Sequence, residues 1–136
     1  MYVAGTFYGA ISVAQACVEA LSKFLCDKRR VAQAQSALGR WNKLCENKII
    51  SESARDAALD LLDASRNDFH HMNAGVEQDH SKLEALAERC VNHLYTIESE
   101  VFAVSFVEPG KLTPSRPEYW PPAGEGVSGV RLRQLY

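Results

Sequence analysis

Proline is absent from the first 108 of the 136 residues, and all five prolines lie between residues 109 and 122. A proline inside a helix removes a hydrogen bond and clashes with the preceding turn, so its absence permits long helices over residues 1–108. The length and the 46% hydrophobic content suit one globular core. We therefore expect a helical bundle domain at residues 1–108 and a Pro/Gly-rich aromatic tail at residues 109–136.

The sequence also lacks the motifs that carry out catalysis or hold cofactors. It contains no glycine-rich phosphate loop, no zinc-binding pattern and no plausible spacing of nucleophile, base and acid. None of the carboxylates in the second half is isolated on an apolar stripe, as a general acid would be. These absences predict a protein that is not an enzyme and that binds no cofactor.

Four histidines raise the question of a metal site, because imidazole is a common ligand. They are His70, His71, His80 and His93. Metal sites in bundles use Glu-x-x-His pairs on several facing helices, and Asp68 with His71 and Glu77 with His80 only approximate that pattern. Cys90 with His93 is a third, weaker pair. We interpret these residues as ordinary polar side chains at a helix corner and predict no metal site.

No two cysteines form a C-x-x-C pair, and the four are spread along the chain. This spacing favours reduced thiols in a cytoplasmic protein over a disulfide framework. Cys45 and Cys90 fall on apolar stripes described below, and we expect these two and Cys17 to be buried and slow to react. Cys26 lies at a predicted turn, and we expect it to react fastest.

Lysine and arginine are absent before Lys23, which argues against a secretory signal because such a signal begins with positive charge. The apolar stretch at residues 5–26 could still span a membrane, and Gly5 and Gly9 form a Gly-x-x-x-Gly pair. A membrane span would place Glu19 in the bilayer, where its charge would cost several kcal/mol. We therefore expect an amphipathic core helix, with Gln15 and Ser22 off its apolar stripe. That stripe comprises Phe7, Ile11, Ala14, Val18, Leu21 and Leu25.

Apolar residues recur at helical spacing in three further segments. The predicted helices cover residues 6–26, 28–47, 53–73 and 76–106, and Ser53 is the expected N-cap of the third. The predicted fold is all-α: an antiparallel helical bundle of about four helices with an irregular C-terminal tail. Two alternatives remain. In one, the helices merge into a long helical hairpin that has to dimerise; in the other, residues 101–107 form a strand.

The later apolar stripes define the expected core. They are Val31, Ala34, Leu38, Trp41 and Cys45 in the second helix, Ala58, Leu62, Ser65, Phe69 and Met72 in the third, and Leu83, Ala87, Cys90, Leu94, Ile97, Val101 and Val104 in the last.

Charge is segregated along the chain. Residues 1–50 hold seven basic and three acidic side chains, whereas residues 51–108 hold four basic and twelve acidic ones. Opposite signs would favour packing of the first half beside the second. Lys28, Arg29 and Arg30 form the basic cluster, which is small for nucleic-acid binding. We interpret it as a solvated corner, with contact to an acidic protein or to nucleic acid as the alternative.

The tail contains Tyr119 and Trp120, although disordered tails are usually depleted in such residues. It either folds back over the bundle and buries Trp120, or docks as a peptide into a partner. We predict a small non-enzymatic interaction protein, such as a binder, inhibitor or immunity-type neutraliser. It would bind another protein through Tyr119, Trp120, Lys28, Arg29 and Arg30. The alternatives are a self-assembling structural subunit and a membrane-active protein using residues 5–26; nucleic-acid and membrane partners are not expected.

Overall fold

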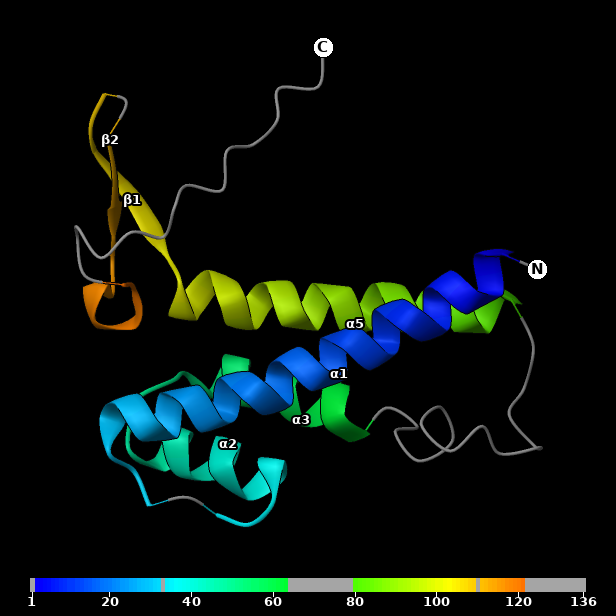
Figure 1. Cartoon of the computed structure of the whole chain (residues 1–136), viewed down its shortest axis with the longest axis horizontal. Helices are drawn as coiled ribbons and strands as arrows, with labels where there is room; N and C mark the ends of the chain where they lie inside the picture. Colours follow the sequence, from blue (N-terminus) through cyan, green and yellow to red (C-terminus); the bar gives the residue numbers. More distant parts are fainter. Residues whose placement is uncertain (1, 33, 64–79, 110, 122–136) are drawn as a thin grey trace. The chain divides into compact units, whose positions relative to one another are not determined.

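The computed structural model describes residues 2–32, 34–63, 80–109 and 111–121. These residues belong to two compact units, Met1–Val101 and Phe102–Tyr136. Helices make up the first unit, and a short hairpin lies in the second (Figure 1). The domain boundary expected after residue 108 therefore falls inside the second unit.

The described part of the first unit contains four helices, α1 (Tyr2–Arg29), α2 (Ala37–Glu46), α3 (Glu52–Asp63) and α5 (His80–Val101). Helix α1 packs against all three others, and α3 also packs against α2 and α5. Figure 1 shows that α1, α2 and α5 run in one direction and α3 in the opposite one. The predicted all-α bundle is confirmed, but its expected antiparallel arrangement holds only for α3, because α1 packs parallel to α2 and α5.

Helix α2 begins at Ala37, nine residues later than the start predicted at residue 28. Two local structures account for the difference. Arg30, just beyond the end of α1, has a positive φ of 54°, so the helix cannot continue through it. The hydroxyl of Ser36 then caps α2 by accepting a hydrogen bond of 3.0 Å from the Gly39 amide. The prediction that Val31 and Ala34 belong to the second helix was therefore wrong, because both residues precede it.

Helix α3 begins at Glu52, and its cap differs from the predicted one. The hydroxyl of Ser51, not that of Ser53, accepts a hydrogen bond of 3.1 Å from the Ala54 amide. The Ser53 side chain is exposed. The expected continuation of this helix to residue 73 and its stripe positions Ser65, Phe69 and Met72 lie outside the described residues.

The core of the first unit lies where α1 meets the other helices. Its buried apolar residues include Ile11, Val18, Leu25, Trp41, Leu44, Ala58, Leu61, Leu83, Ala87, Cys90, Ile97 and Val101. Most of the described stripe residues are buried, but Leu38 is 47% and Val104 44% exposed, so the assignment of these two to the core was wrong. Gln15 and Ser22, expected on the polar face, are buried. Each makes a hydrogen bond that compensates: Gln15 Nε2 donates to Leu61 O at 3.2 Å and Ser22 Oγ to Glu19 O at 2.7 Å.

The second unit contains a two-stranded antiparallel hairpin of β1 (Val104–Glu108) and β2 (Lys111–Pro114). Val104 pairs with Pro114, and the register shifts between Phe106 and Glu108. The last helix ends at Val101, so its predicted extension to residue 106 was wrong and the strand alternative holds. Alternating residues and the following turn at Pro109 favour this pairing. A 3₁₀ helix, η1 (Pro117–Tyr119), follows.

Candidate functional site

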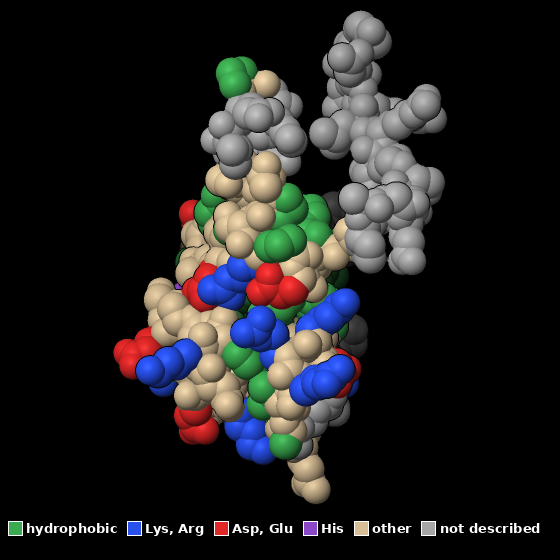
Figure 2. Space-filling view, turned by 90° about the vertical axis from the view of Figure 1, so that its left-hand side faces the viewer, with side chains coloured by type: hydrophobic (Ala, Val, Ile, Leu, Met, Phe, Trp, Pro, Cys, Tyr) green, Lys and Arg blue, Asp and Glu red, His purple; other side chains and the backbone are tan. Residues whose placement is uncertain are grey.

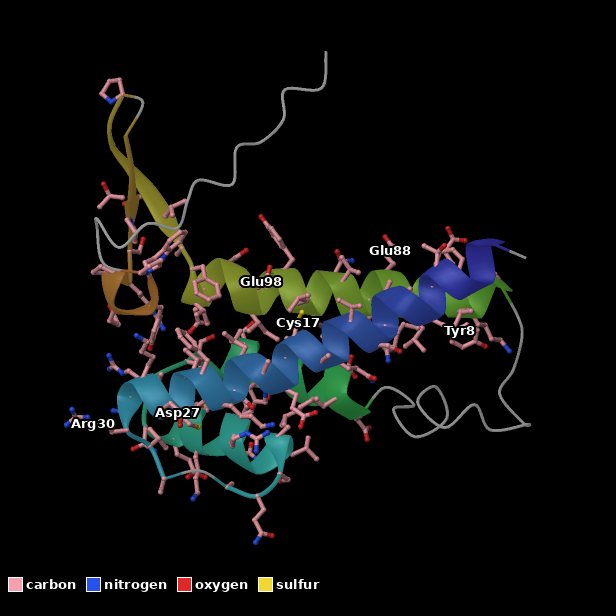
Figure 3. The ribbon with its side chains drawn as sticks, viewed as in Figure 1. Tyr8, Cys17, Asp27, Arg30, Glu88 and Glu98 are labelled. Carbon is pink, nitrogen blue, oxygen red and sulfur yellow. The ribbon has the colours of Figure 1, made fainter. Side chains whose placement is uncertain are left out.

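The predicted basic cluster lies at the end of α1. Lys28, Arg29 and Arg30 are all exposed, and the Lys28 ammonium lies 5.8 Å from the centroid of the Phe24 ring. Helix α2 ends at the same end of the bundle (Figure 1), where Lys48 is also exposed. Figure 2 shows Lys and Arg side chains gathered there with Asp and Glu among them. In Figure 3, Arg30 points away from the bundle. We call Lys28, Arg29, Arg30 and Lys48 the basic end.

Helices α1 and α2 terminate in the same way. At the end of α1, the Val31 amide donates to Cys26 O at 2.9 Å and the Arg30 amide to Asp27 O at 3.3 Å. At the end of α2, the Ile49 amide donates to Leu44 O and the Lys48 amide to Cys45 O, both at 2.9 Å. These bonds define two Schellman motifs, in which the residue with positive φ is usually glycine. Here it is Arg30, with φ 54°, and Lys48, with φ 56°.

A side chain in this left-handed conformation costs about 1 kcal/mol or more relative to glycine. A cation at a helix C-terminus recovers roughly 0.3–1 kcal/mol through the helix dipole. Both helices already carry basic residues in the last turn: Lys28 and Arg29 in α1, and Lys43 in α2. The cations of Arg30 and Lys48 are therefore additional to those that complement the dipoles.

A buried polar network holds α2 beside α1. Arg40 is only 3% exposed. Its Nε donates to Ser22 Oγ at 2.8 Å and its Nη1 to Ala34 O at 3.2 Å, while Nη2 lies 4.0 Å from the Glu19 carboxylate. Lys43 Nζ also donates to Ala32 O at 3.2 Å. These bonds fix the chain between α1 and α2 and so place both helix ends together.

The outward face of α1 is uncharged for nearly four turns. The exposed residues of this face are Thr6, Gly9, Val13, Ala16, Cys17 and Ala20, and Val13 is 61% exposed. A Cβ placed on Gly9 would meet no atom within 4 Å. Glu84, Glu88 and Glu98 are by contrast exposed on α5. Surface helices normally present charged or polar residues outward, so the α1 face, defined by these six residues, is unusual.

Two further exposed apolar side chains lie on the neighbouring helix α5. Val91 is 49% and Tyr95 71% exposed, and the two are one helical turn apart. Figure 3 shows Cys17 on α1 near α5, with Glu88 and Glu98 along α5. Apolar exposure in the described part of the first unit is therefore found on both members of the packed pair α1 and α5.

Titratable groups meet between α3 and α5. Asp60 Oδ2 lies 2.6 Å from His93 Nε2 and 3.2 Å from Arg89 Nε. This cluster is partly exposed and joins the two helices. Cys90 is buried, and burial raises the pKa of its thiol. The positive charge of Arg89 lowers this pKa, and the negative charge of Asp60 raises it further. A raised pKa lowers the thiolate fraction, so Cys90 is the opposite of an activated nucleophile.

No group of three or more metal-binding side chains occurs among the described residues. The predicted pair of Asp68 and His71 lies outside them, as does Glu77. His80 is the first residue of α5, and its side chain is not described. The prediction that these residues form no metal site is therefore untested.

The two predicted aromatic site residues have different environments in the second unit. Tyr119 is buried, whereas Trp120 is 37% exposed. The Trp120 ring meets Phe102 edge to face, with ring centroids 6.0 Å apart. Tyr119 and Trp120 are thus adjacent in sequence but only Trp120 presents substantial surface. Whether this segment covers the bundle or docks into a partner stays a prediction.

One helical segment in the described part of the chain, Thr6–Arg29, is long and apolar enough to cross a membrane. Core helices of soluble proteins and signal sequences meet the same criterion, so length and composition are weak grounds for a span. Of its most apolar stretch, 39% is buried within the protein.

Comparison with known proteins gives no relative: no family model, curated protein or solved structure matches this chain. The candidate surfaces therefore rest on geometry alone. Sequence analysis identified Lys28, Arg29 and Arg30 but missed Lys48, which becomes part of the basic end because of the direction of α2. The α1 face was detectable, because no charge other than Glu19 occurs before Lys23.

Proposed function

We propose that this is a non-enzymatic interaction protein that binds another protein through the α1 face. The observation that carries the proposal is the absence of charge on the exposed residues from Thr6 to Ala20, while α5 exposes several carboxylates. An uncharged outward face loses little polar hydration when a partner covers it. The small residues Gly9, Ala16 and Ala20 would allow the backbone of a partner helix to approach closely.

The chemistry of the site favours binding over catalysis. Its side chains are apolar, apart from the hydroxyl of Thr6 and the thiol of Cys17. Val13, Cys17 and, on α5, Tyr95 would supply the apolar contacts that a helical partner can bury. The proposal extends to the inhibitor or neutraliser role and to the cytoplasmic location, both of which were expected from the sequence.

A pair of matched variants tests the α1 face. Ala16→Glu places a carboxylate on the α1 face, and Ala85→Glu places one on α5, where both alanines are exposed. A photo-crosslinker attached to Cys17 first identifies the partner, and calorimetry then measures its affinity for each variant. We expect Ala16→Glu to weaken binding at least about tenfold and Ala85→Glu to leave it unchanged. Both should keep the wild-type melting temperature, and equal affinities of the two variants would refute the proposal.

A second candidate is attachment of α1 to a lipid bilayer, which the length and apolarity of Thr6–Arg29 favour. Flotation of the purified protein with neutral and anionic vesicles tests it. On the protein-binding proposal, the protein stays with the soluble fraction in both. Flotation abolished by Ala16→Glu but not by Ala85→Glu would establish the membrane alternative.

A further inference from the structure

We infer that the basic end is a docking surface for an acidic segment of another protein. This surface is separate from the α1 face and does not depend on the function proposed for that face. Exposed cations reach it from two parts of the chain, Lys28 and Arg30 from α1 and Lys48 from the end of α2. Arg29 lies between the first two.

The polar network brings these cations to one end of the bundle. Arg40, bonded to Ser22 at 2.8 Å, fixes α2 against the last two turns of α1. Lys43, bonded to Ala32 O at 3.2 Å, fixes the chain that leaves α1 beside the end of α2. Because α1 and α2 run in the same direction, Arg30 and Lys48 follow helix ends that face the same side (Figure 1).

The backbone conformations of Arg30 and Lys48 argue for a role beyond helix termination. Both have positive φ, at 54° and 56°, in a position where glycine is favoured. The helix dipoles already have Lys28, Arg29 and Lys43 in their last turns. A requirement for exposed positive charge accounts for cationic residues at two positions that stability alone would give to glycine.

The pattern of charge points to a protein and not to nucleic acid or a lipid surface. Exposed carboxylates of Asp27, Glu46 and Glu52 lie at or near the same helix ends. Figure 2 shows acidic side chains among the basic ones on this end. A phosphate backbone or an anionic bilayer presents uniform negative charge, which these carboxylates would repel. A peptide can place its acidic residues against the cations alone.

The experiment measures binding of a fluorescent ten-residue peptide that carries two Glu-Asp pairs separated by a run of Ser and Gly. Wild-type protein should bind it, and binding should weaken as salt rises. Arg30→Gly with Lys48→Gly should weaken binding by about tenfold. The same double variant should melt at the wild-type temperature or higher, because glycine fits both positions. A purely structural role for the two cations predicts a lower melting temperature instead.

Two controls separate charge from backbone effects. Arg30→Asn with Lys48→Asn removes the charges but keeps residues that tolerate positive φ, so it should bind as poorly as the glycine variant. Lys82→Gln with Arg89→Gln removes the same charge from α5 and should bind like wild type. Unchanged peptide binding by the glycine variant would overturn the inference. So would wild-type protein that binds a single-stranded oligonucleotide or phosphatidylserine vesicles more tightly than the peptide.

Discussion

The buried guanidinium of Arg40 joins α1, α2 and the chain between them. Replacing it by Met keeps the approximate volume but leaves Ser22 Oγ and Ala34 O without their donor. We expect Arg40→Met to lower the free energy of unfolding by about 2–4 kcal/mol, because buried polar groups would lose their hydrogen bonds. Arg89→Met, at an exposed ion pair with Asp60, should cost less than about 1 kcal/mol. Urea unfolding measures both, and equal losses would contradict the central role of Arg40.

The cysteines differ in burial in a way that the apolar stripes did not predict. Cys17 is exposed and Cys26 buried, the reverse of the expectation for these two, while Cys45 is half-buried and Cys90 buried as expected. Cys17 and Cys26 flank opposite edges of the predicted stripe of α1, and the buried arc is rotated toward Gln15 and Ser22, the edge on which Cys26 lies. Periodicity locates a helix face to within about one residue, or 100°.

Labelling of native protein with a thiol reagent tests this arrangement. Cys17 should react first, Cys45 next, and Cys26 and Cys90 only as fast as the protein opens. Desolvation raises the pKa of both buried thiols, which further lowers their thiolate fraction. Both thiols ionise at a lower pH in the unfolded state than in the folded state. Their contribution to the free energy of unfolding is therefore full below the ordinary cysteine pKa and is lost as the pH rises above it. Labelling of Cys26 before Cys17, read by peptide mass spectrometry, would contradict the structure.

At the scale of elements, the start of α3 is coupled to the end of α5. Ser51 caps α3, and its amide donates to Glu100 Oε1 at 2.8 Å while its hydroxyl contacts the other carboxylate oxygen. Ser51→Ala should therefore lower stability by about 1–2 kcal/mol. Ser53→Ala is the matched control, because Ser53 was the cap predicted from sequence, and it should cost less than about 0.5 kcal/mol. A larger decrease in melting temperature for Ser53→Ala than for Ser51→Ala would identify Ser53 as the N-cap instead.

Element positions were predictable where a stripe was long and had no competitor. The stripe of α5 identified Leu83, Ala87, Cys90, Ile97 and Val101, all of which are buried. The start of α2 was not predictable, because it depends on the tertiary contacts of Arg40 and on a close approach at Gly39. A Cβ on Gly39 would lie 2.8 Å from Ala34 Cβ. Periodicity contains no information on such contacts between segments.

The end of α5 shows a competition between two local preferences. Residues 101–107 fit both a continued helical stripe and an alternating strand, and the strand prevails from Val104. A partner strand at Lys111–Pro114 decides the outcome by pairing with it. That partner was read as part of an irregular tail, because prolines usually exclude a segment from the centre of a sheet. A two-stranded hairpin has only edge strands, so Pro114 is tolerated.

At the scale of the whole molecule, the sequence predicted the ingredients of the basic end but not its assembly. Lys28, Arg29 and Arg30 are contiguous and were recognised as a cluster. Lys48 joins them only because α2 runs parallel to α1, which requires the chain to return along the bundle after Arg30. Hydrophobic periodicity predicts helices but not their directions, and the return path depends on hydrogen bonds such as that from Lys43 to Ala32.

The two tryptophans provide separate probes of the two units. Trp41 is fully buried in the first unit, and Trp120 is 37% exposed in the second. We expect the variant that retains only Trp41, made by Trp120→Phe, to emit at shorter wavelength and to resist acrylamide quenching. The variant that retains only Trp120, made by Trp41→Phe, should emit at longer wavelength and be quenched readily.

Heating the same two variants compares the stability of the units. An isolated two-stranded hairpin is marginally stable, whereas four packed helices form a cooperative core. The Trp120 emission should therefore change at or below the temperature at which Trp41 emission changes. Circular dichroism of each variant gives the helix melting temperature as a control for the substitution itself. A Trp120 transition above that temperature would mean that the second unit outlasts the bundle, and it would contradict this expectation.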